Sequence, residues 1–368
     1  MLDKSKVKIP SKFKDHPIFN ELICGTNFGF MSRYGYYFTD FAKKQPAAMK
    51  EMGVNWTTLN LNVCQERVFS RKLFLDFEFS SSEAEIAETT KSLHENGVRV
   101  VLKPCLTCLD GGSMSQVNFP AKAGLSQIQG VETDYWAEWF ESYTKCIVYC
   151  ADMAERYHIE SLMIGAELYG TLGQEEHWLN LIKEVRKHYS GPISYEFTLS
   201  TTPENAPKWF KELDYLSQSY YPAAAPRNAG FVDSAINNGI RELPDVSVEE
   251  MVEYLKPCNE RLIALCEKCN NMPIAFTEIG VRSSHGSIIL PWEFLWDSYY
   301  DGEEQARYMD AIFTTFTDNP YWMGLFWWKW DETQNRPHYH TDPKGDKGFT
   351  IQGKPAEAVM RRWFAKNK

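Results

Sequence analysis

The sequence predicts an α/β protein built as a single (β/α)₈ TIM barrel. Short apolar runs rich in β-branched residues alternate along the chain with longer amphipathic stretches, a pattern typical of βαβ units and a parallel sheet. Eight such runs can be placed, the number that a closed barrel needs. The Gly-rich first turn of a doubly wound sheet is missing. At 368 residues, the chain fits one barrel of about 250 residues with insertions.

The expected strands are followed in most cases by enough chain for a helix. They lie at Leu22–Phe28, Asn55–Val63, Arg99–Leu106, Ser161–Gly165, Ile193–Thr198, Tyr215–Tyr220, Pro273–Thr277 and Met323–Trp328. Amphipathic helices are expected at Glu83–Asn96, Tyr135–Tyr157, His177–Tyr189 and Val248–Asn270. Ser81 and Ser82 precede two acidic residues, as at a helix N-cap, and Gly97 supplies the glycine that commonly ends a helix with a positive φ.

Nothing in the composition marks a boundary inside the chain, since it holds no Pro/Gly/Ser-rich linker, long charge run or repeat. We therefore expect one catalytic domain over residues 1–368, with residues 1–20 as an N-terminal extension. The segment Met1–Phe19 lacks the apolar core of a signal peptide, and no apolar run reaches the length of a membrane span. The nine cysteines, an odd number, suggest reduced thiols. These features predict a cytoplasmic protein.

The charge balance limits the possible partners. A net charge of −10 and a pI of about 5.4 argue against a nucleic-acid partner, which would need a basic surface. No membrane partner is expected, and the sequence predicts no oligomeric state. Aromatic residues make up 14% of the chain, and flat aromatic rings suit the apolar faces of sugar rings as well as a protein core.

Two glutamates lie at the C-terminal ends of expected strands, where the active sites of barrel enzymes are found. The fourth expected strand runs into Glu167 and the seventh into Glu278, so both lie at the C-terminal mouth. A carboxylate that ends an apolar strand is costly unless it is solvated, paired or functional, and a single one is more often structural. Two on facing strands match glycoside hydrolysis, which needs an acid for the leaving oxygen and a carboxylate that attacks or activates water.

Several stretches around these glutamates carry a resemblance to a known family. They are Cys24-Gly25-Thr26-Asn27-Phe28-Gly29, Ile164-Gly165-Ala166-Glu167-Leu168, Ser219-Tyr220-Tyr221-Pro222, Phe276-Thr277-Glu278-Ile279-Gly280, Gly324-Leu325-Phe326-Trp327-Trp328-Lys329-Trp330 and Gly353-Lys354-Pro355-Ala356. The chain resembles clan A of the retaining (β/α)₈ glycoside hydrolases and looks most like glycoside hydrolase family 113, whose known members are mainly β-mannanases. The resemblance implies Glu167 as acid/base and Glu278 as nucleophile. It also implies double displacement on a β-linked oligo- or polysaccharide, with β-mannan or manno-oligosaccharide as the first expectation.

Two departures from the wider pattern bear on the substrate. Ala166 stands where much of the clan carries an asparagine that binds the sugar 2-hydroxyl, but family 113 also lacks that residue. Cys105, in Lys103-Pro104-Cys105, stands where the family tends to have histidine. The thiol changes the hydrogen bonds available at the mouth, so a β-glycosidase of the same clan with another sugar specificity is the alternative.

Further residues are expected to bind the substrate. Tyr220 and Gln218 share one face of the sixth strand, from which Tyr220 would donate to Glu278, or else fill the core. Trp328 is expected to be the platform for the sugar, with Trp330 on the same face of the eighth strand and Trp327 on the other. Polar residues at the ends of the second and third strands would bind sugar hydroxyls or fill the polar top layer of the barrel. These are Asn60, Asn62 and Lys103.

No metal or cofactor is predicted. Cys105-x-x-Cys108 and Cys266-x-x-Cys269 have the spacing of a zinc site, but the first pair follows a strand at the top of the barrel and the second ends a helix at the bottom. The long loops Pro222–Ser247 and Asp331–Gly348 are expected to form walls of the substrate cleft. The second contains His338, His340 and Asp342, a less favoured metal-binding group.

Two rival functions stay open. The first is a non-catalytic carbohydrate-binding barrel, which would not need both glutamates. The second is a metal-dependent barrel hydrolase, which the absence of His-x-His after the first strand disfavours.

Overall fold

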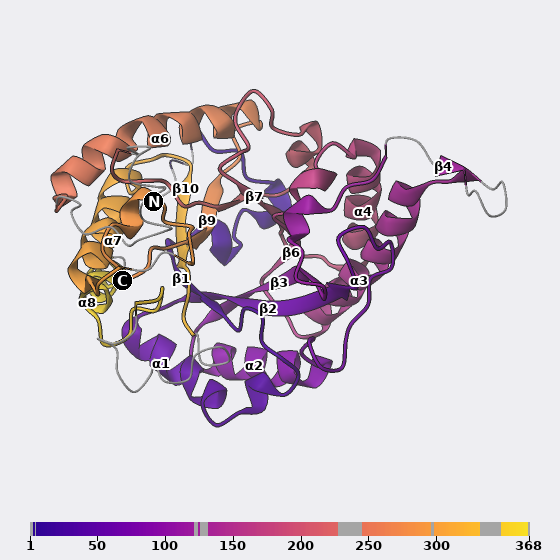
Figure 1. Ribbon diagram of the computed structural model, residues 1–368, viewed down its shortest axis with the longest axis horizontal. Helices are drawn as coiled ribbons and strands as arrows, with labels where there is room; N and C mark the ends of the chain where they lie inside the picture. Colours follow the sequence, from indigo (N-terminus) through magenta and orange to yellow (C-terminus); the bar gives the residue numbers. More distant parts are fainter. Residues whose placement is uncertain are drawn as a thin grey trace.

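Eight parallel strands form a closed barrel, as the sequence predicted (Figure 1). The computed structural model describes residues 3, 5–120, 124–125, 132–226, 245–295, 298–331 and 347–366. Around the barrel the order is β1, β10, β9, β8, β7, β6, β3, β2. Their bounds are β1 Ile23–Phe28, β2 Trp56–Gln65, β3 Arg99–Cys108, β6 Ser161–Ala166, β7 Ile193–Thr198, β8 Leu216–Ser219, β9 Ile274–Ile279 and β10 Trp322–Trp327. All eight strands lie where they were expected, with ends that shift by a residue or two.

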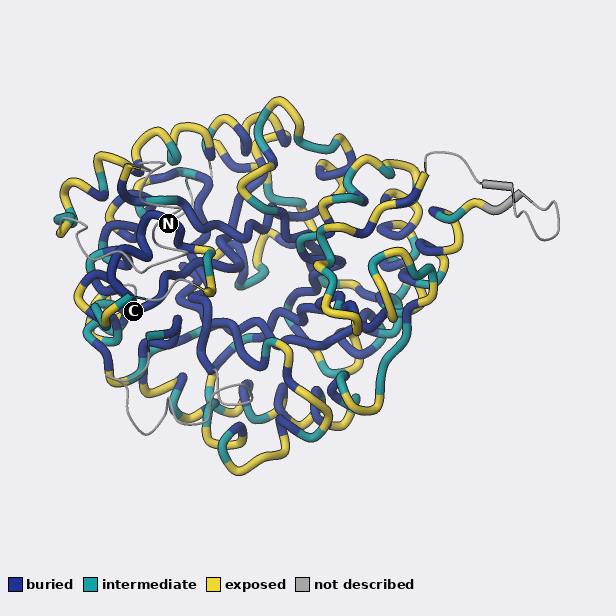
Figure 2. Tube along the Cα trace, viewed as in Figure 1, coloured by how far each residue is buried: buried dark blue, intermediate teal, exposed yellow. Residues whose placement is uncertain are grey.

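Helices cover the outside of the barrel, so that the strands are buried and the outer helix faces are exposed (Figure 2). They are α1 Gln45–Met52, α2 Glu83–Glu95, α3 Tyr135–Arg156, α4 Glu175–His188, α6 Val248–Lys268, α7 Gly302–Phe316 and α8 Pro355–Ala365. Short 3₁₀ helices are η1 Ser11–Phe13, η2 Pro17–Phe19, η3 Tyr36–Phe38, η4 Ala42–Lys44, η5 Met114–Gln116, η6 Tyr169–Thr171, η7 Lys208–Glu212 and η8 Ser287–Ile289. The connection from β7 to β8 uses η7 in place of an α-helix. Among the described helices, none is both long and apolar enough to cross a membrane.

Local sequence signals explain how α2 begins and ends. Ser82 is its N-cap and forms a reciprocal capping box with Glu85, which satisfies backbone donors that the first turn leaves unpaired. After the helix, Gly97 has a φ of +76°, a conformation that glycine adopts without a steric penalty. A short antiparallel pair, β4 Gly124–Leu125 with β5 Glu132–Thr133, precedes α3.

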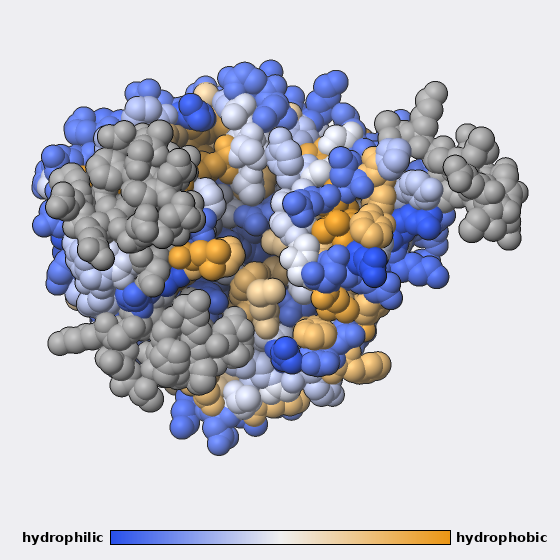
Figure 3. Space-filling model, in the orientation of Figure 1, coloured by the Kyte–Doolittle hydropathy of each residue, from blue (hydrophilic) through white to orange (hydrophobic). Residues whose placement is uncertain are grey.

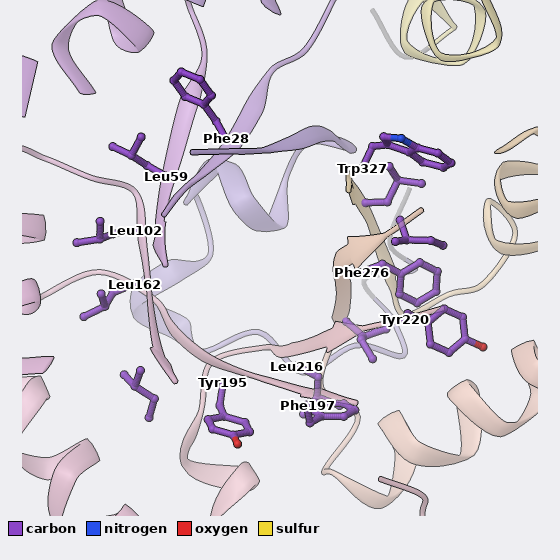
Figure 4. Packing of buried hydrophobic residues seen from close by; sticks show 14 of the residues in the cluster. Phe28, Leu59, Leu102, Leu162, Tyr195, Phe197, Leu216, Tyr220, Phe276 and Trp327 are labelled. Atoms are coloured by element: carbon purple, nitrogen blue, oxygen red, sulfur yellow. The ribbon is translucent and has the colours of Figure 1, made fainter. Parts of the chain in front are cut away.

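Two apolar layers hold the barrel together. In the larger, side chains such as Leu59, Leu102 and Phe276 point from the strands toward the helices (Figure 4). The smaller includes Phe13 and Phe19, from η1 and η2, together with residues of the barrel strands such as Trp56, Met163 and Phe326. Residues of the N-terminal segment are therefore part of the barrel's own core.

Candidate active site

Glu278 lies in β9 with donors on both of its carboxylate oxygens. The Lys103 ammonium contacts Oε1. The Tyr221 hydroxyl donates to Oε2 over 3.1 Å, and the Ser219 hydroxyl lies 3.5 Å from the same oxygen. Only 8% of Glu278 is exposed. These three donors fix the orientation of the Glu278 carboxylate.

A break in strand register accompanies the inward orientation of Glu278. Phe276 packs outward, with its ring 4.3 Å from that of Tyr220, so strict alternation would turn Glu278 outward as well. Between these residues the pairing shifts, since Gln218 pairs with Phe276 but Ser219 pairs with Glu278. Such an irregularity re-aims a side chain without ending the strand, and it brings Glu278 to the donors on β3 and β8.

Glu167 directly follows β6 and has a φ of +54°, a left-handed conformation that non-glycine residues rarely adopt. Such backbone strain is concentrated at functional sites. The side chain is half-buried, and burial followed by the negative charge of Glu278 raises its pKa, while Ser219 and Lys103 lower it. The Ser219 hydroxyl, which lies 3.5 Å from Glu278 Oε2, thus also lowers the pKa of Glu167. Glu167 is thus a carboxyl group suited to hold a proton beside a charged partner.

A third carboxylate, Glu196 of β7, was not singled out in the sequence. It is fully buried, and its oxygens lie 2.8 and 2.9 Å from Lys103 Nζ. Burial raises the pKa of Glu196 to about 8, although the charge of Lys103 opposes that shift. Burial alone would lower the pKa of Lys103, but Glu196 and Glu278 outweigh it, so the ammonium stays charged. The available signal was a charged residue inside an otherwise uncharged strand, Ile193–Thr198.

The structure corrects the prediction for Lys103. Its side chain was expected to bind substrate, but it is 0% exposed and is bound by two carboxylates. Lys103 therefore forms ion pairs with Glu196 and Glu278 and does not present its ammonium group to a substrate.

The prediction for Tyr220 was wrong by one residue. Tyr220 and Gln218 do share a face, but Tyr220 points away from the barrel axis onto Phe276 and Phe316 (Figure 4). The neighbouring Tyr221 makes the expected bond to Glu278. The inward residues of β8 are Ser217 and Ser219, and a shift of one position moves every side chain to the other face.

Trp328 and Trp330, which follow β10, lie in different surroundings. The ring centroids of Trp328 and Phe30 lie 4.5 Å apart in an edge-to-face arrangement. Trp328 also packs in a cluster with Phe349 and with Tyr221, which contacts Glu278. Trp330, which was expected to share its face, is buried in the outer core and donates to Gln45 Oε1 over 2.9 Å. The prediction for Trp330 was wrong because β10 ends at Trp327, so strand alternation does not extend that far.

The asparagines belong to the polar top layer. Asn62 donates both amide hydrogens to backbone oxygens, of Ser32 over 3.0 Å and of Phe79 over 2.7 Å. It therefore holds the loops of the mouth rather than presenting donors to a sugar, which corrects its assignment to substrate binding. Asn60 donates to the Phe28 oxygen and accepts from Cys105 Sγ.

His338, His340 and Asp342, the less favoured metal-binding alternative, lie outside the described residues, as does most of the two long loops. Within the described part of the chain, Asp245, His285 and Asp301 each place one ligand atom within 4.8 Å of the others. Among the described residues, neither the hydrogen bonds of Glu278 nor the groups that shift the pKa of Glu167 include any of these three side chains.

The hollow near the middle of the face in Figure 3 overlies the barrel. Glu278 is held by three donors, whereas Glu167 has a raised pKa, and both lie at the mouth of a (β/α)₈ barrel. This arrangement is typical of the barrel glycoside hydrolases as a class of protein. The model of Glycoside Hydrolase Family 113 matches residues 26–354. The chain belongs to this family.

Solved structures share the barrel fold. The GH113 β-mannanase AaManA from Alicyclobacillus acidocaldarius, in complex with ManMIm, is 26% identical with a TM-score of 0.76, covering 95% of this chain and 98% of its own. A GH113 β-1,4-mannanase gives 24% identity and a TM-score of 0.73, over 94% and 99% of the two chains. A β-glucuronidase from an uncultured Clostridium sp. shares the fold at 15% identity and a TM-score of 0.51, over 89% of this chain and 47% of that one. No curated protein matches the chain.

Proposed function

We propose that the protein is a retaining β-glycoside hydrolase acting on β-mannan or manno-oligosaccharides. The observation that carries this proposal is the asymmetry of the two glutamates. Glu278 is surrounded by a cation and two hydroxyl groups, as a carboxylate nucleophile requires. The raised pKa of Glu167 suits a proton donor. The 26% identity to a β-mannanase over nearly the whole chain supports the choice of sugar.

The reaction follows from these positions in two steps. In the first, a Glu278 oxygen bonds to the anomeric carbon while the glycosidic C–O bond breaks and Glu167 gives its proton to the leaving oxygen. In the second, Glu167 removes a proton from water, the water oxygen bonds to the anomeric carbon, and Glu278 leaves as a carboxylate. Trp328, beside Tyr221, is the proposed platform for the apolar face of the sugar.

A cleavage assay on paired variants tests the roles of the glutamates. Glu278→Ala should abolish turnover of an aryl β-mannoside or manno-oligosaccharide, and added azide should restore activity with an inverted glycosyl azide as the product. Glu167→Ala should stay active on substrates with a good leaving group and yield a retained azide. Inverted azide from Glu167→Ala would reverse the two assignments.

A panel of aryl β-glycosides tests the choice of sugar. The second candidate, another β-glycoside, is favoured by Cys105, whose thiol is buried against Asn60 rather than presented to the mouth. A preference for glucosides or galactosides over mannosides would replace mannan as the substrate class while leaving the chemistry intact.

A further inference from the structure

Glu196 is an acidic side chain of the site that neither chemical step uses. Its carboxylate is fully buried and contacts Lys103, and among the described residues no other donor reaches it. A buried carboxylate with a single partner contributes little to stability, because its desolvation offsets the attraction. Its backbone oxygen accepts from the Glu167 amide over 2.9 Å, so β7 also holds the acid in register.

Lys103 connects Glu196 to the reacting carboxylate. Its ammonium lies between Glu196 and Glu278 and is itself fully buried. When Glu278 becomes an ester in the covalent intermediate, it loses its negative charge. Lys103 would then be a buried cation without that partner, which is costly. Glu196 is the carboxylate already in contact with the same nitrogen.

We propose that Glu196 is a positioning residue that balances the charge of Lys103 while Glu278 is glycosylated, and thereby stabilises the covalent intermediate relative to the free enzyme. This inference rests on the proposed function, because it requires a covalent bond between Glu278 and the sugar. It assigns opposite effects to Glu196 in the two steps, since a group that stabilises the intermediate favours its formation and opposes its breakdown.

The surroundings of Glu196 add a pH dependence. The groups that face it are the Lys103 ammonium, the Glu167 and Glu278 carboxyls, the Tyr221 hydroxyl and, beside Lys103, the Cys105 thiol. Burial, Glu278 and Glu167 hold its pKa at about 8 in the free enzyme. Glycosylation neutralises Glu278 and so eases the ionisation of Glu196. Formation of the intermediate is therefore favoured as pH rises toward 8.

The test measures the two steps separately. The purified full-length enzyme is treated with 2,4-dinitrophenyl 2-deoxy-2-fluoro-β-glycosides of mannose and mannobiose, whose leaving group needs no proton. Intact mass follows labelling, and recovery of activity follows release of the sugar. Glu196→Gln should label about tenfold more slowly and recover about tenfold faster, because losing a charge-assisted hydrogen bond corresponds to roughly 10- to 150-fold in equilibrium. The rise in labelling rate toward pH 8 should also disappear.

The matched control is Glu85→Gln, which removes an equally buried carboxylate that lies in the capping box of α2. Both of its rates should match the wild type. Lys103→Met should slow recovery, and adding Glu196→Gln to it should restore part of the loss because the uncompensated charge is removed. If Glu196→Gln does not fold, Glu196→Asp keeps the charge at a longer distance and should shift both rates in the same directions by less.

The outcomes separate the two proposals. A wild-type enzyme that is labelled at Glu278 neither by these reagents nor by the corresponding fluoro-glycosides of glucose and galactose would overturn the proposed function and this inference together. A labelled wild type with unchanged rates for Glu196→Gln, or with both steps slowed as in general damage to the site, would overturn only the role of Glu196.

Discussion

The Tyr221→Phe variant removes one hydroxyl from the site and leaves the ring in place. That hydroxyl donates to Glu278 over 3.1 Å. Burial, followed by the charge of Glu278, raises the pKa of Tyr221 far above its ordinary value, so the phenol remains a donor. The bond is strong to a carboxylate and weak to an ester, and it therefore assists the departure of Glu278 in the second step. A hydrogen bond to a charged group is worth about 1.5–3 kcal/mol, or about 10- to 150-fold in rate.

The assay compares Tyr221→Phe with Tyr220→Phe in burst-phase kinetics on a dinitrophenyl β-mannoside or on the preferred glycoside. Tyr221→Phe should show a lower steady-state rate after a full burst, because the covalent intermediate accumulates. Tyr220→Phe should change the rate by no more than about twofold, because the ring of Tyr220 packs outward on Phe276. Equal losses in the two variants, or a larger loss at Tyr220, would refute the assignment of Tyr221 to Glu278.

Three further predictions concern the core, the acid and the sugar platform. Phe276→Ala should lower the free energy of unfolding by about 3–5 kcal/mol in urea titrations, because it removes a fully buried ring that stacks on Tyr220; a loss below about 1 kcal/mol would contradict that packing. The raised pKa of Glu167 should place the basic limb of kcat/KM above the ordinary glutamate range, since activity needs the protonated form and is lost as pH rises through that pKa. Glu167→Gln should lack that limb with activated substrates, and its persistence would assign the limb to another group. Trp328→Ala should raise KM more than it lowers kcat, and unchanged kinetics would remove Trp328 from the sugar site.

The barrel was predictable because its signals are local and repeated. Each strand is an apolar run of adequate length, and α2 carries both its capping box and its terminal glycine in the sequence. The positions of Glu167 and Glu278 followed from strand ends alone, since the mouth of a parallel barrel is always at the C-terminal ends of its strands. The side-chain contacts of these two glutamates could not be predicted in the same way, because each contact depends on whether a neighbouring residue points into the barrel or toward the helices.

Three of the corrections concern details that strand position alone does not determine. Tyr220, Trp330 and Lys103 were placed from strand alternation or from position along a strand. A one-residue error in phase exchanged Tyr220 for Tyr221, and the end of β10 at Trp327 removed Trp330 from the pattern. Lys103 was correctly placed at the mouth, but the sequence does not show that two carboxylates from β7 and β9 converge on it. Such long-range pairings arise only when the barrel closes.

The groups that act on Glu278, directly or through Lys103, therefore divide into two kinds with opposite effects on the rate of the second step. Tyr221 and Lys103 donate to its charged form, so their loss should slow the step in which Glu278 leaves. Glu196 competes for Lys103, so its loss should strengthen the hold of Lys103 on Glu278 and speed that step. If Tyr221→Phe and Glu196→Gln changed the recovery rate in the same direction, charge could not be the link between them, and Lys103 would have to be treated as a purely structural cation.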